Sequence, residues 1–156
     1  MGYTLRSHGR VLGTTAVELP PPAPRTRSWQ FLPAPAFAEA RELFAALPAA
    51  IEDSQDAIPT VGELEAIPEA EREEQVRALL KADSRMIRFI ELSERLEAMA
   101  LELVDAEGAR LDVATIGVTE LAIGADAFRD VLKSVDAAAD LTAASAPPFY
   151  LLVASM

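Results

Sequence analysis

The spacing of the apolar residues changes along this chain, and that change restricts the fold more than any other feature. Strand-forming residues, among them Tyr3, Leu5, Val11 and Val17, mark the stretch from Tyr3 to Leu19. Apolar residues repeat every second position around residues 99–103, whereas those between these stretches recur every three or four positions. A period of two is typical of strands, and a period of 3.6 is typical of helices. The chain therefore reads as strands, then helices, then strands, with one more helix before a last strand.

This order predicts an α+β fold. We expect a mostly antiparallel sheet that is built from an N-terminal hairpin, a hairpin near 97–118 and a C-terminal strand. Several amphipathic helices should pack against this sheet. A length of 156 residues fits a single domain over 1–156, with a proline-rich connector at 20–24.

The N-terminal hairpin is predicted to turn at His8-Gly9, where glycine can adopt positive φ. Gly13 is expected at a bulge or a second bend. Residues 27–32 follow the connector and are predicted to form a short strand that ends at Pro33.

Five helices are predicted from the apolar stripes and the capping signals. The first runs from Pro35 to Pro48, a capping box at Thr60 starts the next segment, and Pro68 opens an acidic helix that ends near Ala82. Asp83 or Ser84 should cap the following helix, and Asp126 the last one. The side chains expected to face inward on these helices are Phe37, Ala40, Phe44, Leu47, Val76, Leu79, Leu80, Met86, Phe89, Ile90, Leu96, Phe128, Val131, Leu132 and Val135.

Two apolar runs, 97–104 and 110–118, flank the acidic segment 105–108. A short polar segment that ends in glycine, here Gly108, is typical of a hairpin turn. A calcium loop would need acidic or amide ligands at alternate positions over a dozen residues, and this segment offers too few. We therefore predict a turn and no metal site.

The C-terminal run Phe149-Tyr150-Leu151-Leu152-Val153 is apolar at every position. Strands that are covered on both faces have this composition. An edge strand that pairs with another chain and a membrane-surface anchor are the two alternatives. Burial in the domain's own sheet is the simplest explanation, so we expect a central strand here.

The net charge of −11 is unevenly distributed. Residues 1–38 sum to +3, which leaves −14 for the remainder. The acidity concentrates at Glu63, Glu65, Glu69, Glu71, Glu73 and Glu74. A large negative charge disfavours general binding to nucleic acid, because phosphates are repelled. The acidic residues are interpreted either as a solvated helix face or as a binding surface for a basic protein.

Few residues in the chain can support catalysis. The absence of cysteine excludes disulfides, thiolate metal sites and thiol nucleophiles, and a single histidine, His8, excludes a two-histidine metal motif. Phosphate-binding glycine loops and the nucleophile elbow are absent from the sequence. Glu91, Glu94 and Glu97 could perform acid–base chemistry only if one were desolvated. The sequence thus favours a protein that is not an enzyme and uses no cofactor and no metal.

One stretch interleaves basic and aromatic residues, Arg25, Arg27 and Trp29. It could contact an anion, or Trp29 could anchor the core while the two arginines point outward. The second interpretation is favoured, because a second aromatic platform is missing.

These observations predict a non-catalytic protein-interaction domain of an accessory, regulatory or immunity type that acts through its acidic surface. The expected partner is another protein, for which a basic one would fit, and a homodimer is also open. The alternative is a small-ligand-binding domain or minor enzyme with carboxylates in a pocket between sheet and helices. Arg6 and Arg10 interrupt any signal peptide, and no apolar run is long enough to span a bilayer, so a cytoplasmic location without membrane contact is expected.

Overall fold

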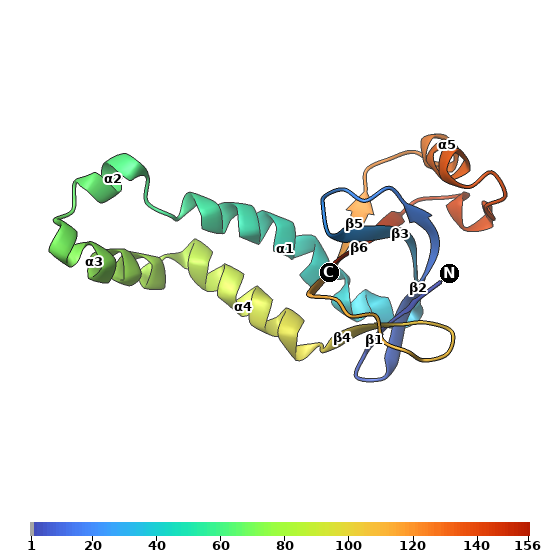
Figure 1. Cartoon of the computed structure of the whole chain (residues 1–156), viewed down its shortest axis with the longest axis horizontal. Coiled ribbons are helices and arrows are strands. Elements are labelled where there is room, and N and C mark those ends of the chain that lie inside the picture. Colours follow the sequence, from blue (N-terminus) through green and yellow to red (C-terminus); the bar gives the residue numbers. More distant parts are fainter. Residues whose placement is uncertain (1) are drawn as a thin grey trace. The chain divides into compact units, whose positions relative to one another are not determined.

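The computed structural model describes residues 2–156, which form an α+β fold with a curled antiparallel six-stranded sheet and five α-helices. The chain divides into two compact units (Figure 1). The sheet unit contains the described residues up to Ala45 together with Met99–Met156, and the helical unit contains Ala46–Ala98. The single domain expected over 1–156 stays a prediction.

The N-terminal hairpin is confirmed. β1 (Thr4–Ser7) pairs antiparallel with β2 (Arg10–Leu19), and the connecting turn has positive φ at both His8 and Gly9. Two successive positive φ angles are those of the turn whose twist matches a hairpin, and glycine adopts them without steric cost.

A bulge interrupts this hairpin next to Gly13. Leu5 lies opposite Gly13 and Arg6 lies opposite Val11, so Leu12 is an extra residue in β2. A Cβ on Gly13 would lie 2.3 Å from Phe31 Cζ and 2.5 Å from the Leu32 carbonyl oxygen. Glycine is thus required here because β2 and β3 approach too closely for any side chain.

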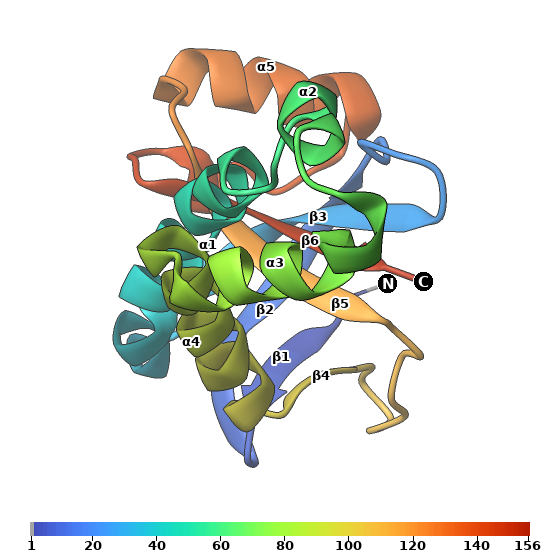
Figure 2. The same ribbon diagram turned by 90° about the vertical axis from the view of Figure 1, so that its left-hand side faces the viewer.

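The sheet order is β4-β1-β2-β3-β6-β5, with β3 at Thr26–Pro33, β4 at Leu101–Val104, β5 at Thr115–Leu121 and β6 at Phe149–Ser155. The predicted central strand is confirmed, since β6 crosses the sheet between β3 and β5 (Figure 2). The proline-rich connector at 20–24 joins β2 to β3.

The hairpin near 97–118 exists only in a short form. The Arg110 backbone bridges Val104, and Leu111 N donates to the Leu103 carbonyl. The rest of the second apolar run departs and forms β5 at the opposite edge of the sheet. Ile116 and Val118 are buried there beside β6, which explains why an apolar run follows the turn without continuing the local ladder.

Aromatic side chains fill the core on one face of the sheet. Phe37, from the 3₁₀ turn η1 (Pro35–Phe37), packs edge-on against Phe31 and Tyr150 with ring centroids 5.2 and 5.3 Å apart. It also stacks on Phe44 of α1 (Ala38–Asp56). Such pairs add specificity to the burial of large apolar area.

The predicted end of the first helix at Pro48 is wrong, because α1 continues through Pro48 to Asp56. Proline removes one helical hydrogen bond. Leu47 and Ala50 on either side are both buried, and packing of this apolar stripe offsets the lost bond.

The other face of the sheet is covered by α5 (Ala125–Val135) and the turn η2 (Thr142–Ala144). Phe128 stacks on Phe149 of β6 with centroids 4.5 Å apart, and Leu132 is fully buried. Two details of the prediction are wrong. The N-cap is Gly124 and not Asp126, and the outer edge of the predicted stripe, Val131 and Val135, is exposed.

The helical unit contains the end of α1 followed by α2 (Val61–Glu65), α3 (Glu69–Ala82) and α4 (Ser84–Ala98). The predicted bounds of α3 and the predicted start of α4 are confirmed, whereas α4 continues to Ala98, past the predicted start of a strand at residue 97. Ile90 was expected to face inward but is 46% exposed, whereas Leu92 is buried. In this unit the other buried side chains are Leu47, Ala50 and Ser54.

Candidate functional site

The six glutamates of the acidic surface lie on two consecutive helices of the helical unit. Thr60 caps α2 by accepting a hydrogen bond from the Glu63 N–H, as the capping box predicts. The chain turns at Pro68, and α3 begins with Glu69 and Glu71 in its first turn. Carboxylates in a first turn face the positive end of the helix dipole, which explains their position locally. The structure exposes all six, namely Glu63, Glu65, Glu69, Glu71, Glu73 and Glu74.

Few positive charges neutralise this surface. Glu73 pairs with Arg77 at 2.9 Å, with both side chains more than 70% exposed. Among the described residues, this is the only ion pair that any of the six glutamates forms within 4 Å. Arg72 does not form such a pair, since its guanidinium donates to the Ile67 carbonyl. Most of the negative charge therefore faces solvent.

The junction between α3 and α4 is fixed by Asp83. Its carboxylate accepts hydrogen bonds from the Arg85 N–H at 2.8 Å and from the Arg85 guanidinium at 3.1 and 2.8 Å. These bonds lower the pKa of Asp83 to about 2, and the bond from the Arg85 side chain has the largest effect. Asp83 is thus the cap of α4 that the sequence offered as one of two candidates.

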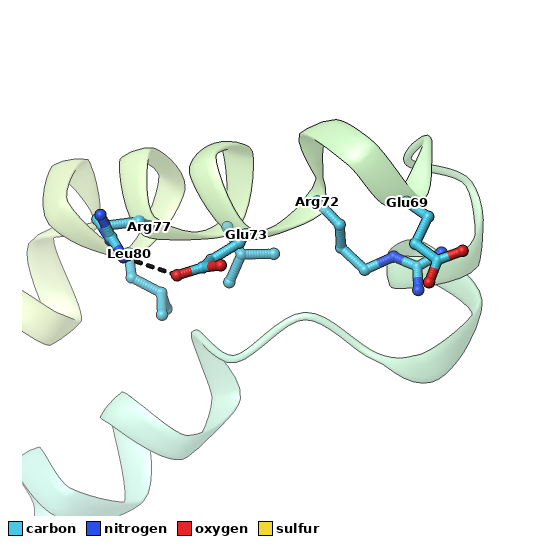
Figure 3. A pocket seen from close by; sticks show the side chains of 6 residues that line it. Glu69, Arg72, Glu73, Arg77 and Leu80 are labelled. Carbon is cyan, nitrogen blue, oxygen red and sulfur yellow. Dashed lines mark hydrogen bonds and ion pairs between the residues drawn. The ribbon is translucent and has the colours of Figure 1, made fainter.

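A hollow of about 550 Å³ opens along α3. Arg72, Val76, Arg77 and Leu80 line it, together with Glu69 and Glu73. Figure 3 shows Arg72, Glu69 and Leu80 projecting from the same side of the helix. All lining residues belong to α3, so no other element contributes to the wall of this hollow.

The three residues of the possible anion contact do not form one open site. Trp29 is fully buried, and Arg25 lies exposed in the connecting turn with a positive φ. The Arg27 guanidinium lies 4.8 Å above the Trp29 ring and donates to both Glu18 carboxylate oxygens at 2.8 and 3.0 Å. Its charge is therefore already matched within the sheet unit.

The sequence did not predict two partners of Arg27. Glu18 and Tyr3 lie on or beside strands that pair near Arg27, and the Tyr3 ring is 5.6 Å from the guanidinium. The hydrogen bond to Arg27 lowers the pKa of Glu18, and the same bond raises the pKa of Arg27. The alternation in β2 could have indicated Glu18, but its register with β3 depends on a bulge.

A second hollow, of about 530 Å³, lies between β2 and the end of α5 in the sheet unit. Its wall includes the carboxylates of Glu18, Asp136 and Asp140. Hydrogen bonds from the Thr142 hydroxyl and N–H lower the pKa of Asp140. The sequence offered no signal for this hollow, because the residues come from segments more than 100 positions apart.

The acidic turn at 105–108 is confirmed as a turn. Asp105 Oδ1 accepts hydrogen bonds from the N–H groups of Glu107 and Ala109, each at 2.9 Å, and Gly108 has a positive φ. The Asp105 carboxylate thus stabilises the turn by binding the backbone N–H groups that follow it. Residues 2–156 contain no cluster of three or more side chains suited to hold a metal ion.

Comparison with protein families, with curated proteins and with solved structures finds no match for this chain. No helix among residues 2–156 combines the length and the apolar character that crossing a membrane requires.

Proposed function

We propose that this protein is a non-catalytic interaction domain of an accessory or regulatory kind, and that it binds another protein through the acidic surface of α2 and α3. One observation carries the proposal: six exposed glutamates share a single ion pair with the rest of the described chain. Unneutralised charge of one sign steers a partner of opposite charge and accelerates its association. A basic protein is the partner that fits.

The alternative, a ligand-binding domain or minor enzyme, draws support from the hollow between β2 and α5. Its carboxylates argue against acid–base catalysis. A general acid at neutral pH needs a raised pKa, whereas the pKa values of Glu18 and Asp140 are lowered. The interaction domain is therefore the better-supported function.

The test compares proteins captured from a native lysate by three forms of the full chain. The first is the wild type, and the second carries Glu69→Gln, Glu71→Gln, Glu73→Gln and Glu74→Gln. The matched control neutralises four exposed carboxylates of the sheet unit by Glu42→Gln, Glu107→Gln, Asp112→Asn and Asp130→Asn.

We expect a partner that the wild type and the control retain and that the α3 variant loses, with binding that weakens as salt is added. Capture of the same proteins by all three forms would contradict the acidic surface. A thermal-shift screen against metabolites addresses the alternative, and a ligand that stabilises the chain but not a variant of Asp136 would favour it.

A further inference from the structure

Helix α3 carries an apolar stripe, formed by Val76, Leu79 and Leu80, that the chain covers only in part. No residue of α3 is buried, and Leu79 is 57% exposed. Val76 and Leu80 line the open hollow, and Figure 3 shows Leu80 there. A helix of a soluble protein ordinarily buries such a stripe, because packing of the apolar face supplies most of its stability. Part of the stripe therefore lacks a partner.

The charges in the two halves of α3 have opposite signs. Residues 69–74 contain four glutamates and one arginine, a net charge of −3. In the C-terminal half of the same helix, residues 77–82 contain Arg77 and Lys81, a net charge of +2. Both basic residues are exposed, and Arg77 pairs with Glu73 one turn earlier in the helix. Val76 lies between the two halves, and Leu79 and Leu80 lie between the two basic residues.

We propose that a second copy of this chain covers the stripe, with the two α3 helices antiparallel about a two-fold axis. In that arrangement the acidic half of each copy faces the basic half of the other, and the apolar residues meet in the middle. A parallel arrangement would place like charges opposite each other. This inference rests on the proposed function and identifies the basic partner surface as the chain's own.

A two-fold contact also satisfies the geometry of closed assemblies. The same patch serves both copies, so the contact closes at two chains and does not propagate. One crossing pair of helices buries less than the roughly 1,200 Å² of a standard interface. The dimer is therefore a weak one, which forms at micromolar or higher concentration and dissociates as salt is added.

Complementary charge reversals test the arrangement in the full chain. One variant carries Glu73→Lys and Glu74→Lys, and the other carries Arg77→Glu and Lys81→Glu. Each variant alone places like charges opposite each other, so its self-association should weaken tenfold or more. An equimolar mixture should restore a 1:1 heterodimer, because each altered half then faces a half of opposite charge. Sedimentation velocity over a concentration series measures both effects.

The matched control for the first variant is Glu107→Lys with Asp130→Lys, which makes the same change in net charge on the sheet unit and should dimerise like the wild type. Circular dichroism verifies that each variant retains its helix content. A wild type that stays monomeric at several hundred micromolar overturns the inference, as does a mixture that fails to associate. If the wild type is monomeric while lysate capture still depends on the α3 glutamates, self-association fails and the proposed function stands.

Discussion

The sheet unit contains most of the buried apolar side chains, whereas the helical unit leaves most of its own exposed or half-buried. Among residues 2–156, nineteen of the 22 buried apolar residues lie in the sheet unit, and only Leu47, Ala50 and Leu92 lie in the helical unit. The helical unit nevertheless contains six of the ten exposed large apolar side chains, namely Ile51, Ile58, Val61, Leu79, Ile87 and Ile90. The sheet unit is thus stabilised by its own tertiary packing, and the helical unit depends more on caps and local ion pairs.

The change with the largest expected effect on this contrast is deletion of residues 149–156. This change removes β6, which pairs with β3 on one side and β5 on the other, and it removes the buried Leu152 and Ala154. We expect an insoluble chain or one without a cooperative thermal transition, measured by solubility and circular dichroism. A truncated chain that remains monomeric and melts near the full-length temperature would show that the sheet unit does not depend on its interior strand.

A matched pair of leucines compares the two units directly. Leu152 in β6 is fully buried and Leu79 in α3 is 57% exposed. Leu152→Ala should lower the free energy of unfolding by about 2–5 kcal/mol, because it leaves a cavity in the core. Leu79→Ala should change it by less than about 0.5 kcal/mol. Chemical denaturation of the two variants, at a concentration where the wild type is monomeric, measures the difference, and equal losses would contradict the contrast.

Within the sheet unit, two glycines test how tightly the strands pack. Gly13→Ala places a Cβ against the Phe31 ring and the Leu32 carbonyl, and this overpacking should cost about 1–3 kcal/mol. Gly117→Ala in β5 meets no atom within 4 Å, so it serves as the control and should be close to neutral. Equal stability of the two variants would mean that β2 and β3 separate easily, and the close approach would then not be a constraint.

The same contrast explains how far the sequence could predict this fold. The N-terminal turn, the Thr60 cap and the interior position of β6 follow from local chemistry and from an unbroken apolar run. The position of β5 could not be predicted, because strand order depends on long-range pairing that a local turn does not encode. The helix end predicted at Pro48 is wrong for a related reason. Packing of the buried Leu47 and Ala50 outweighs the local tendency of proline to end a helix.

The candidate site divides in the same way. The acidic surface could be predicted because consecutive helices carry its residues. The pairing of Arg27 with Glu18 could not, because a bulge in β2 sets which residues lie opposite β3. Ile90 and Val131 were predicted inward because helical spacing gives a stripe but not its width, and only the packed neighbours determine how much of the stripe is covered.

A smaller effect concerns the stability of the helical unit at low pH. The pKa of Asp83 is lowered to about 2 by its bonds to Arg85, so the ionised carboxylate favours the folded state. This stabilisation is complete above about pH 4 and is lost as the pH falls toward 2. Asp83→Asn keeps an N-capping side chain without the charge. The helical signal of the variant should therefore fall less than that of the wild type between pH 4 and 2, and parallel profiles would contradict the role of this pair.

The smallest expected effect on stability comes from neutralising the acidic half of α3. Glu69→Gln, Glu71→Gln, Glu73→Gln and Glu74→Gln together should leave the melting temperature within a few degrees of the wild type. The exposed carboxylates make one ion pair within the helix, and such surface pairs contribute little. If the charges serve association, the same variant should associate more slowly and with a weaker salt dependence. A large loss of melting temperature would instead place these glutamates among the groups that hold the helical unit together. Unchanged stability with unchanged association would leave them the single role of keeping the protein in solution.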